Sequence, residues 1–433
     1  MPSVDTASAP PLGPGLDLAA RLPAGPRIEV TSLLEQLESV SDPRSGQGVR
    51  YRLPTLLAIT VCATTGTGHD SFTAIGEWCQ RTARQAPHVL ERLGVPHDPF
   101  SGRLRVPDEK TFRDVASRLE AAELTRAGFD FLRPLIGSAA TGALTPDGVR
   151  EREQRRVSRA GARADSHPAE HRQAYAVDGK YLRGARRPDG SKVIILSAVR
   201  HGDGLTVAAR EIAAKTNEIP EFQPLLDQIE DADLTGAVIT ADALHAQRAH
   251  AAYLVEERHA HYLLTVKHNQ RTLARQLSRL PWKEVPVLHT QTGRGHGREE
   301  QRRVQVVSVN NLLFPHARQV LRIERKRRRL GAKKWQTETV FAITDLTAEQ
   351  AGAEEIATWA REHWTVENTV HWSRDVTFRE DHCQVRTAGA PAVLAAVRDL
   401  IRGALHVAGY ANTATGRRGH TKPEQALALY RIE

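Results

Sequence analysis

The sequence predicts an α/β protein with a mixed β-sheet, helices on the sheet faces, a β-rich insertion and an all-helical N-terminal region. Three patterns predict this fold class. Apolar residues recur at three-to-four spacing from 29 to 143, strand-like and helical runs alternate from 173 to 270, and only strand-like runs occur from about 284 to 346. The chain has 433 residues, of which 40% are hydrophobic, so two or three domains with sizeable cores are expected.

The chain is predicted to begin with a disordered tail, residues 1–28, followed by a helical N-terminal domain, residues 29–143. The tail is rich in Pro, Gly and Ala and lacks apolar periodicity. Helices are predicted over VTSLLEQLESV, YRLPTLLAITVCA, SFTAIGEWCQRTA and PDEKTFRDVASRLEA, with Ser71 and Asp108 as N-caps. Short helices of this kind are typical either of a helix-turn-helix DNA reader or of a bundle that packs against another domain, and both interpretations stay open.

A polar, arginine-rich linker is expected over residues 144–172, ahead of the first part of the core, residues 173–270. The core opens with the strand-like runs AYAVDG, SKVIILSAVR and LTVAAREI, and the dipeptide Asp189-Gly190 predicts a hairpin between the first two. A helix over 220–229, the strand GAVITAD, the helix AQRAHAAYLVEER and the strand HYLLTVK follow. An antiparallel meander that passes into βαβ units predicts a mixed sheet.

The β-rich insertion is expected over residues 271–346, and a C-terminal helical part over residues 347–433. The strand-like runs of the insertion are VPVLHT, RRVQVVSV, QVLRIERK and TETVFAITDL. One hairpin, RIERKRRRLGAKK, carries eight Lys or Arg residues. Charged side chains can prevent an edge strand from pairing with another chain, but eight cations are more than this role requires. Contact with phosphates is therefore favoured. Helices are predicted over AEEIATWAREHWTVENTVHW and PAVLAAVRDLIRGAL.

Composition narrows the function classes. Lys and Arg outnumber Asp and Glu by 60 to 51, which suits a polyanionic partner as well as ordinary solubility. Cys62, Cys79 and Cys383 form no CxxC pair, so neither a zinc cluster nor a disulfide framework is expected. No apolar run reaches the about 20 residues of a membrane helix, and no signal peptide is found. A cytoplasmic, nucleoid-associated protein without membrane contact is therefore expected.

Three carboxylates stand where a catalytic site would need them. Asp178 interrupts the first strand, where a buried carboxylate is costly unless it is paired or binds a metal. Asp242 ends the strand GAVITAD, at the edge where ligands bind in such sheets. Glu367 lies on a helix and shares a face with His363 and His371. Oxygen ligands suit Mg²⁺ or Mn²⁺, and two ions about 4 Å apart would clamp the two oxygens of a phosphodiester displacement.

The segments AVDGKYLRGAR, ITADALHAQ, LLTVKHNQ and HWTVENTVHWSRDVTFREDHCQVRT together resemble bacterial insertion-sequence transposases of the DDE class, in the ISAs group of H-repeat-associated proteins. The stretches DPRSGQGVRYRLPTLLAITVCA and SFTAIGEWCQ resemble the accessory domain of that family, and the likeness runs from about residue 35 to 410. The resemblance implies a ribonuclease H-like catalytic core, in which Asp178, Asp242 and Glu367 match the metal-binding triad with two ions. It also implies double-stranded DNA partners, namely transposon ends and target DNA, and a homodimer on DNA.

Further residues near the triad are candidates for DNA contact. Arg374 stands seven residues after Glu367, as a basic residue does in related groups, whereas His363 replaces their upstream arginine and Arg361 is its substitute. Each remaining candidate also has a bland alternative as a packing, capping or exposed polar residue. The remaining candidates are Lys180, His245, Lys267, Asn269, Gln270, Trp364, Trp372, His371 and Arg386.

The function predicted from these features is a metal-dependent transposase that hydrolyses DNA at each element end and transfers the 3′-OH ends to target DNA. One alternative is a catalytically retired DNA-binding protein, which the loss of a triad acid would favour. A second is a stand-alone nuclease that shares the site but performs no strand transfer. All three acids are present.

Overall fold

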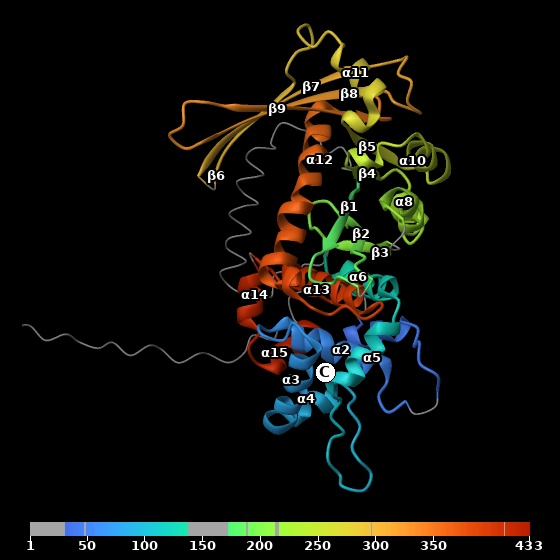
Figure 1. Cartoon of the computed structure of the whole chain (residues 1–433), viewed down its shortest axis with the longest axis vertical. Coiled ribbons are helices and arrows are strands. Elements are labelled where there is room, and N and C mark those ends of the chain that lie inside the picture. Colours follow the sequence, from blue (N-terminus) through green and yellow to red (C-terminus); the bar gives the residue numbers. More distant parts are fainter. Residues whose placement is uncertain are drawn as a thin grey trace, which may run out of the picture.

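The computed structural model describes residues 31–46, 49–136, 172–187, 189–212, 216–295, 297–410 and 412–433 (Figure 1). The predicted tail, residues 1–28, lies outside the described residues, and so does the predicted linker, residues 144–172, apart from its last residue.

The N-terminal region is helical, as its periodicity predicts. The side chain of Ser71 accepts a hydrogen bond from the Ala74 amide, and that of Asp108 accepts one from the Thr111 amide, so both predicted N-caps are confirmed. The helices are α1 (Leu33–Gln36), η2 (Leu37–Ser39), α2 (Leu53–Thr65), α3 (Phe72–Gln85), α4 (Pro87–Arg92), α5 (Glu109–Arg118) and α6 (Ala121–Ile136).

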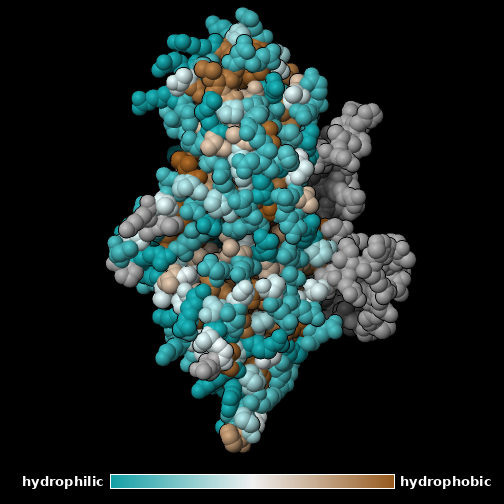
Figure 2. All heavy atoms as spheres, turned by 90° about the vertical axis from the view of Figure 1, so that its right-hand side faces the viewer, coloured by the Kyte–Doolittle hydropathy of each residue, from teal (hydrophilic) through white to brown (hydrophobic). Residues whose placement is uncertain are grey.

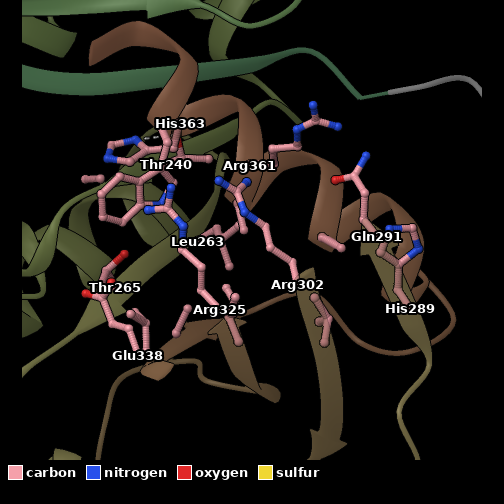
Figure 3. A pocket seen from close by; sticks show the side chains of 18 residues that line it. Thr240, Leu263, Thr265, His289, Gln291, Arg302, Arg325, Glu338, Arg361 and His363 are labelled. Atoms are coloured by element: carbon pink, nitrogen blue, oxygen red, sulfur yellow. Dashed lines mark hydrogen bonds between the residues drawn. The ribbon is translucent and has the colours of Figure 1, made fainter. Parts of the chain in front are cut away.

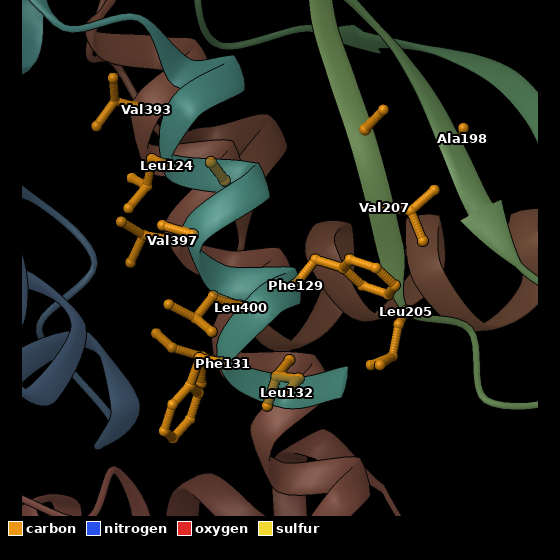
Figure 4. Close-up of a cluster of buried hydrophobic side chains, with 14 of the residues drawn as sticks. Leu124, Phe129, Phe131, Leu132, Ala198, Leu205, Val207, Val393, Val397 and Leu400 are labelled. Atoms are coloured by element: carbon orange, nitrogen blue, oxygen red, sulfur yellow. The ribbon is translucent and has the colours of Figure 1, made fainter. Parts of the chain in front are cut away.

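Helix α6 packs between the sheet and α13 (Ala390–Val407), and so ties the N-terminal helices to the rest of the chain (Figure 4). One hydrophobic cluster runs from Leu33 through α6 to Ile432, across the predicted domain boundaries. A Cβ atom on Gly403 of α13 would come within 2.6 Å of Leu132 and 2.8 Å of Leu205. A glycine therefore lets α13 approach both α6 and the sheet closely, because no side chain would fit there.

The described residues form one nine-stranded sheet with the order β3-β2-β1-β4-β5-β9-β8-β7-β6. Strand β1 pairs antiparallel with β2 and parallel with β4, and β4 pairs parallel with β5, so the predicted mixed sheet is confirmed. The strands of this half are β1 (Ala174–Leu182), β2 (Val193–Arg200), β3 (Thr206–Ile212), β4 (Val238–Ala241) and β5 (His261–Val266). Helices and turns that join them are α8 (Glu218–Leu226), α9 (Asp231–Leu234), η4 (Ala243–His245), α10 (Arg248–Ala252), η5 (Tyr253–Glu257) and η6 (His268–Gln270).

The β-rich segment extends this sheet and does not form a sheet of its own, because β9 pairs antiparallel with β5. Its strands are β6 (His289–Gly295), β7 (Arg298–Ser308), β8 (Gln319–Arg329) and β9 (Gln336–Thr344). The strand predicted over 285–290 is wrong in place, since β6 begins only at His289, past Pro286, which has no amide hydrogen to donate. Helix α11 (Arg271–Ser278) was not predicted.

A long helical segment crosses the sheet beside β1 and β4 (Figure 1). It begins as α12 (Ala353–Thr365) and continues as the π-helical turns η7 (Val366–His371) and η8 (Ser373–Thr377). Because π-helical turns shift which residues share a face, they are frequent at functional sites. The chain ends with η9 (Glu380–His382), α13, α14 (Thr413–Gly419) and α15 (Pro423–Leu429).

Hydrophilic side chains cover most of the face shown in Figure 2, and apolar ones form small separate groups. No helix in the described ranges is long and apolar enough to cross a bilayer.

Candidate active site

The register of β1 and β4 brings two acids together at one edge of the sheet. The last paired residues are Val177 and Ala241, so Asp178 and Asp242 follow on neighbouring parallel strands. Asp178 accepts a hydrogen bond of 3.0 Å from the Gly179 amide. Asp242 caps the turn η4 by accepting one of 2.8 Å from the Leu244 amide. The strand pairing therefore places the backbones of the two aspartates next to each other.

Asp178 is held in an environment that disfavours its charge. Burial raises the pKa of its carboxyl from the ordinary 3.8 to about 7, and the charges of Asp242, Glu218 and Glu367 add to this rise. Its side chain keeps 28% exposure. Within the described ranges no Lys or Arg pairs with Asp178, and a bound cation would supply the positive charge that this group of acids lacks.

Glu367 is exposed on η7, between two histidines that face the sheet. One turn before it, His363 Nδ1 lies 3.0 Å from the buried Thr240 hydroxyl of β4. One turn after it, His371 Nδ1 lies 3.5 Å from Asp178 Oδ2. The helix that carries Glu367 is thus anchored to both acid-bearing strands.

Both histidines are neutral at neutral pH. Burial lowers the pKa of His363 to about 4 and that of His371 to about 3. The contact between His371 and Asp178 is therefore not a salt bridge, and Asp178 gains no compensating charge from it.

A divalent cation suits the donors of this site, although no three His, Cys, Asp or Glu side chains of the described residues are grouped closely enough to hold one. Asp178 and Asp242 are adjacent oxygen donors in like-charged surroundings, which is the chemistry that a hard cation requires. Glu367 belongs to the same electrostatic group, because its charge contributes to the raised pKa of Asp178.

Sequence reasoning missed a fourth carboxylate, Glu218, at the start of α8. Its carboxyl group lies directly over Gly179 and near Asp178. The helix was predicted from Pro220, so Glu218 was placed in a loop. The signal was present, since Asn217 is a favourable N-cap and an acidic residue in the first turn is typical of a helix start.

Two predicted DNA-contact residues are instead buried in ion pairs. Lys180 shares the side of β1 that carries Asp178, as predicted, and its Nζ lies 2.6 Å from Asp375 Oδ1. Arg374 is 1% exposed and pairs with Glu380 at 2.9 Å and with Asp399 at 3.2 Å. Both cations are committed to protein partners, so we do not place them in the proposed DNA interface.

Three more candidates shape the loop after Asp242. His245 is fully buried, and its Nε2 lies 3.3 Å from Glu218 Oε2. The Asn269 side-chain amide donates to the Ala243 carbonyl, and that of Gln270 donates to the Ala246 carbonyl at 2.9 Å. These contacts join η6 to η4 and so position the turn that Asp242 begins.

A pocket beside this edge gathers other candidates between α12 and the strands β6 to β9 (Figure 3). Thr240 and Ala241, just before Asp242, form part of its wall. Arg302 and Arg325 point into it, and Arg361 of α12 also lines it. It is also lined by His363 and Trp364.

The remaining candidates lie at the surface. The Lys267 ammonium lies 6.0 Å from the centre of the Trp364 ring, a cation–π distance. Arg386 is exposed and donates to the Gly184 carbonyl at 3.2 Å. Trp372 is 53% exposed.

Comparison with known proteins finds two matching families and several relatives. Residues 164–390 match the family described as Transposase DDE domain, and residues 34–132 match the family described as DDE_Tnp_1-associated. The protein YbfL of Escherichia coli K12 is 28% identical over 397 residues, which cover 86% of this chain and 90% of that protein. "H repeat-associated putative transposase YhhI" of the same strain is 24% identical with the same coverage. A piggyBac transposase in a synaptic complex with hairpin DNA aligns with 92% of this chain and 74% of its own, at 11% identity, and its TM-score of 0.34 does not establish a shared fold.

Proposed function

The chain belongs to the Transposase DDE domain family, and from this premise we propose that it is a metal-dependent DNA transposase with a ribonuclease H-like core. Its catalytic acids in this proposal are Asp178, Asp242 and Glu367. The observation that carries the proposal is the register of β1 and β4, which sets Asp178 and Asp242 side by side at the edge that the Glu367 helix crosses.

In the proposed reaction, water attacks the phosphorus at the element end and the P–O3′ bond breaks, which leaves a 3′-OH on the element and a 5′-phosphate on the flank. That 3′-OH then attacks a target phosphorus, a new P–O bond forms and the target P–O3′ bond breaks. Divalent cations, when bound, would lower the pKa of the water and neutralise charge on the phosphoryl oxygens.

The chain's own residues prepare the site for this chemistry. Asp178, Asp242 and Glu367 would hold the cations through carboxylate oxygens. His371 packs against Asp178 while staying neutral, so it limits the freedom of that carboxylate without competing with a cation for it. Two buried ion pairs, those of Lys180 and Arg374, hold the helical segment on which Glu367 and His371 lie.

We propose that DNA lies along the face of β7 and β8 that continues from the pocket. Arg302 and Arg325 share Glu300, and Glu338 also lines the pocket, so the net positive charge of this face comes from the arginines further along β8. Arg327 and Arg329 follow Arg325 at every second residue of β8 and continue the same face. Basic side chains thus continue along β8 away from the catalytic acids. They would contact the phosphates of a DNA strand whose reacting phosphate lies at the catalytic site.

The proposed partners are the terminal inverted repeats and the target DNA, bound by a homodimer because two ends must be joined together. A nuclease without strand transfer would use the same carboxylates. A retired DNA-binding protein is the less favoured alternative, since the three acids are retained.

One reconstituted reaction tests the proposal. Purified protein is incubated with the DNA that flanks its gene, a target plasmid and Mg²⁺, and the products are sequenced. We expect element ends joined to the target. Cleavage without joining would indicate a nuclease, and tight binding with neither reaction in Mg²⁺ or Mn²⁺ would contradict the proposal and favour the retired DNA-binding protein.

A further inference from the structure

We propose that Glu218 is a fourth carboxylate of the cation site. Gly179 has no side chain and so leaves room for the Glu218 carboxyl group beside Asp178, and the buried His245 orients that group. This inference rests on the proposed metal-dependent function and adds to it a residue outside the triad. Three observations carry it: a glycine whose missing Cβ leaves room for the carboxylate, a buried hydrogen-bond partner, and, within the described ranges, the lack of any Lys or Arg beside the carboxylate.

Gly179 lets the Glu218 carboxyl group lie against the backbone of β1. A Cβ atom at position 179 would lie 2.3 Å from Glu218 Oε1 and 2.4 Å from its Cδ, so any other residue would displace the carboxylate. Gly179 directly follows Asp178 and donates its amide to Oδ1 of that residue. The glycine in the middle of a strand is thereby explained, and it brings a second acid to the position next to Asp178.

His245 holds the other side of the carboxylate. Its Nε2 lies 3.3 Å from Glu218 Oε2 and its side chain is fully buried. It is stacked near Phe222 and His250, with ring centroids 5.0 Å and 5.6 Å away. Because His245 is the last residue of the turn that Asp242 caps, this contact ties Glu218 to the second acid-bearing strand.

A purely structural role does not account for the charge on Glu218. Among the described residues, no Lys or Arg lies within ion-pair distance of it, and its side chain is only 22% exposed. Glu221, one turn later on α8, pairs with Arg210 of β3. An acid beside Asp178 that has no Lys or Arg partner is unfavourable unless a cation joins the group.

The experiment measures Mn²⁺ binding to the full chain without DNA, from the electron paramagnetic resonance signal of free Mn²⁺. Glu218→Gln keeps the shape and an acceptor for His245, and we expect Mn²⁺ affinity to fall about tenfold or more. Glu221→Gln is the matched control on the same helix, with an expected change of less than about twofold, because Glu221 already pairs with Arg210. Asp178→Asn is the reference for the triad and should lose binding as well.

The outcomes separate this inference from the proposed function. If Asp178→Asn loses Mn²⁺ while Glu218→Gln binds like Glu221→Gln, Glu218 only packs and the inference is overturned while the triad stands. If wild type binds no Mn²⁺, or none of the variants changes it, the metal site itself is wrong and both fail.

A second variant guards against misfolding. Gly179→Ala keeps every carboxylate but pushes Glu218 aside, and we expect it to weaken Mn²⁺ binding as Glu218→Gln does. Circular dichroism spectra that match the wild type establish that each variant is folded. A folded Gly179→Ala protein with wild-type affinity would contradict the proposed position of Glu218.

Discussion

Two groups of buried charges involve the helical segment of η7 and η8, and they differ in how their charges are compensated. In the first group, burial and neighbouring acids raise the pKa of Asp178 to about 7. In the second, Glu380 is 1% exposed and lies among Arg374 and Arg398, and these guanidinium groups lower the pKa of its carboxyl to about 2. Burial alone raises the pKa of both carboxyls, so the neighbouring charges decide the difference.

The charges that surround a buried acid distinguish a structural role from a functional one. Glu380 joins η9 to η8 and α13 through Arg374 and Arg398, and its charge is neutralised within the protein. Asp178 has a neutral histidine and other acids beside it, and no Lys or Arg of the described residues pairs with it, so its charge is not compensated by this part of the chain. An uncompensated carboxylate at a sheet edge is a candidate for catalysis, whereas a compensated one in the interior holds elements together.

The largest expected effect is on the chemistry. Asp178→Asn, Asp242→Asn and Glu367→Gln should each reduce Mg²⁺-dependent cleavage by about a thousandfold or more, since members of a catalytic set act as a unit. DNA binding should stay near wild type, because these residues would touch cations and not the phosphate backbone at large. Cleavage of labelled end DNA and a gel-shift assay measure the two properties. Full cleavage by any one variant would mean that the wrong carboxylate has been assigned.

The largest change in the free energy of unfolding is expected for the group around Glu380. Glu380→Gln leaves Arg374 and Arg398 without their shared anion, so we expect the free energy of unfolding to fall by about 3–5 kcal/mol. Asp178→Asn removes an uncompensated charge and should leave that free energy unchanged or raise it. Urea unfolding at neutral pH without divalent ions compares the two variants. A stable Glu380→Gln protein beside a destabilised Asp178→Asn protein would reverse the assignment of the two groups.

The pH dependence of stability sharpens the same comparison. The pKa of Asp178 is higher in the folded chain than its ordinary 3.8, so the folded form holds the proton more tightly, and stability falls as pH rises from about 4 to about 7. Glu380 acts in the opposite sense, because its lowered pKa contributes stability above pH 4.5 that is lost as pH falls towards 2.

Between pH 5 and 7.5 the buried histidines act against Asp178: the pKa values of His250, His363 and His371 are lowered, so they make the folded chain more stable as pH rises through about 6.5. The Asp178 effect is therefore the difference between two proteins, and the urea midpoint of wild type relative to that of Asp178→Asn should fall from pH 5 to pH 7.5. Mg²⁺ should restore wild-type stability at pH 7.5. Equal pH slopes in the two proteins would show that Asp178 ionises normally.

The smallest expected effect is on DNA binding by the face of β7 and β8 that continues from the pocket. Arg302 and Arg303 are neighbours on β7, but Arg302 lines the pocket while Arg303, by strand alternation, points to the other side of the sheet. Arg302→Ala should weaken DNA binding and lower the slope of log affinity against log salt by about one. Arg303→Ala should leave that slope unchanged. Titrations at several salt concentrations measure both, and equal slopes would place the DNA elsewhere.

Much of the fold could be predicted because its signals are local. Period-two runs gave β1 and β2, a helical run gave α13, and short polar side chains marked the caps of α3 and α5. Asp178 and Asp242 stood out because a carboxylate in or after an apolar strand is unusual. What failed was long-range or depended on few residues, such as the start of β6, helix α11 and the pairing of β9 with β5.

The site, too, could be predicted from the sequence only in part. The sequence was sufficient for the order of the elements and for the positions of the two aspartates, within β1 and directly after β4, because apolar runs mark the strands around them. Three features became known only from the tertiary structure. Glu218 lies near Asp178 because Gly179 leaves room for it, and Lys180 and Arg374 form ion pairs with acids of the protein. The β-rich strands continue the sheet that carries Asp178 and Asp242. The physical reason is that periodicity records which face of an element is apolar, whereas the partner of a buried charge depends on packing between segments far apart in the chain.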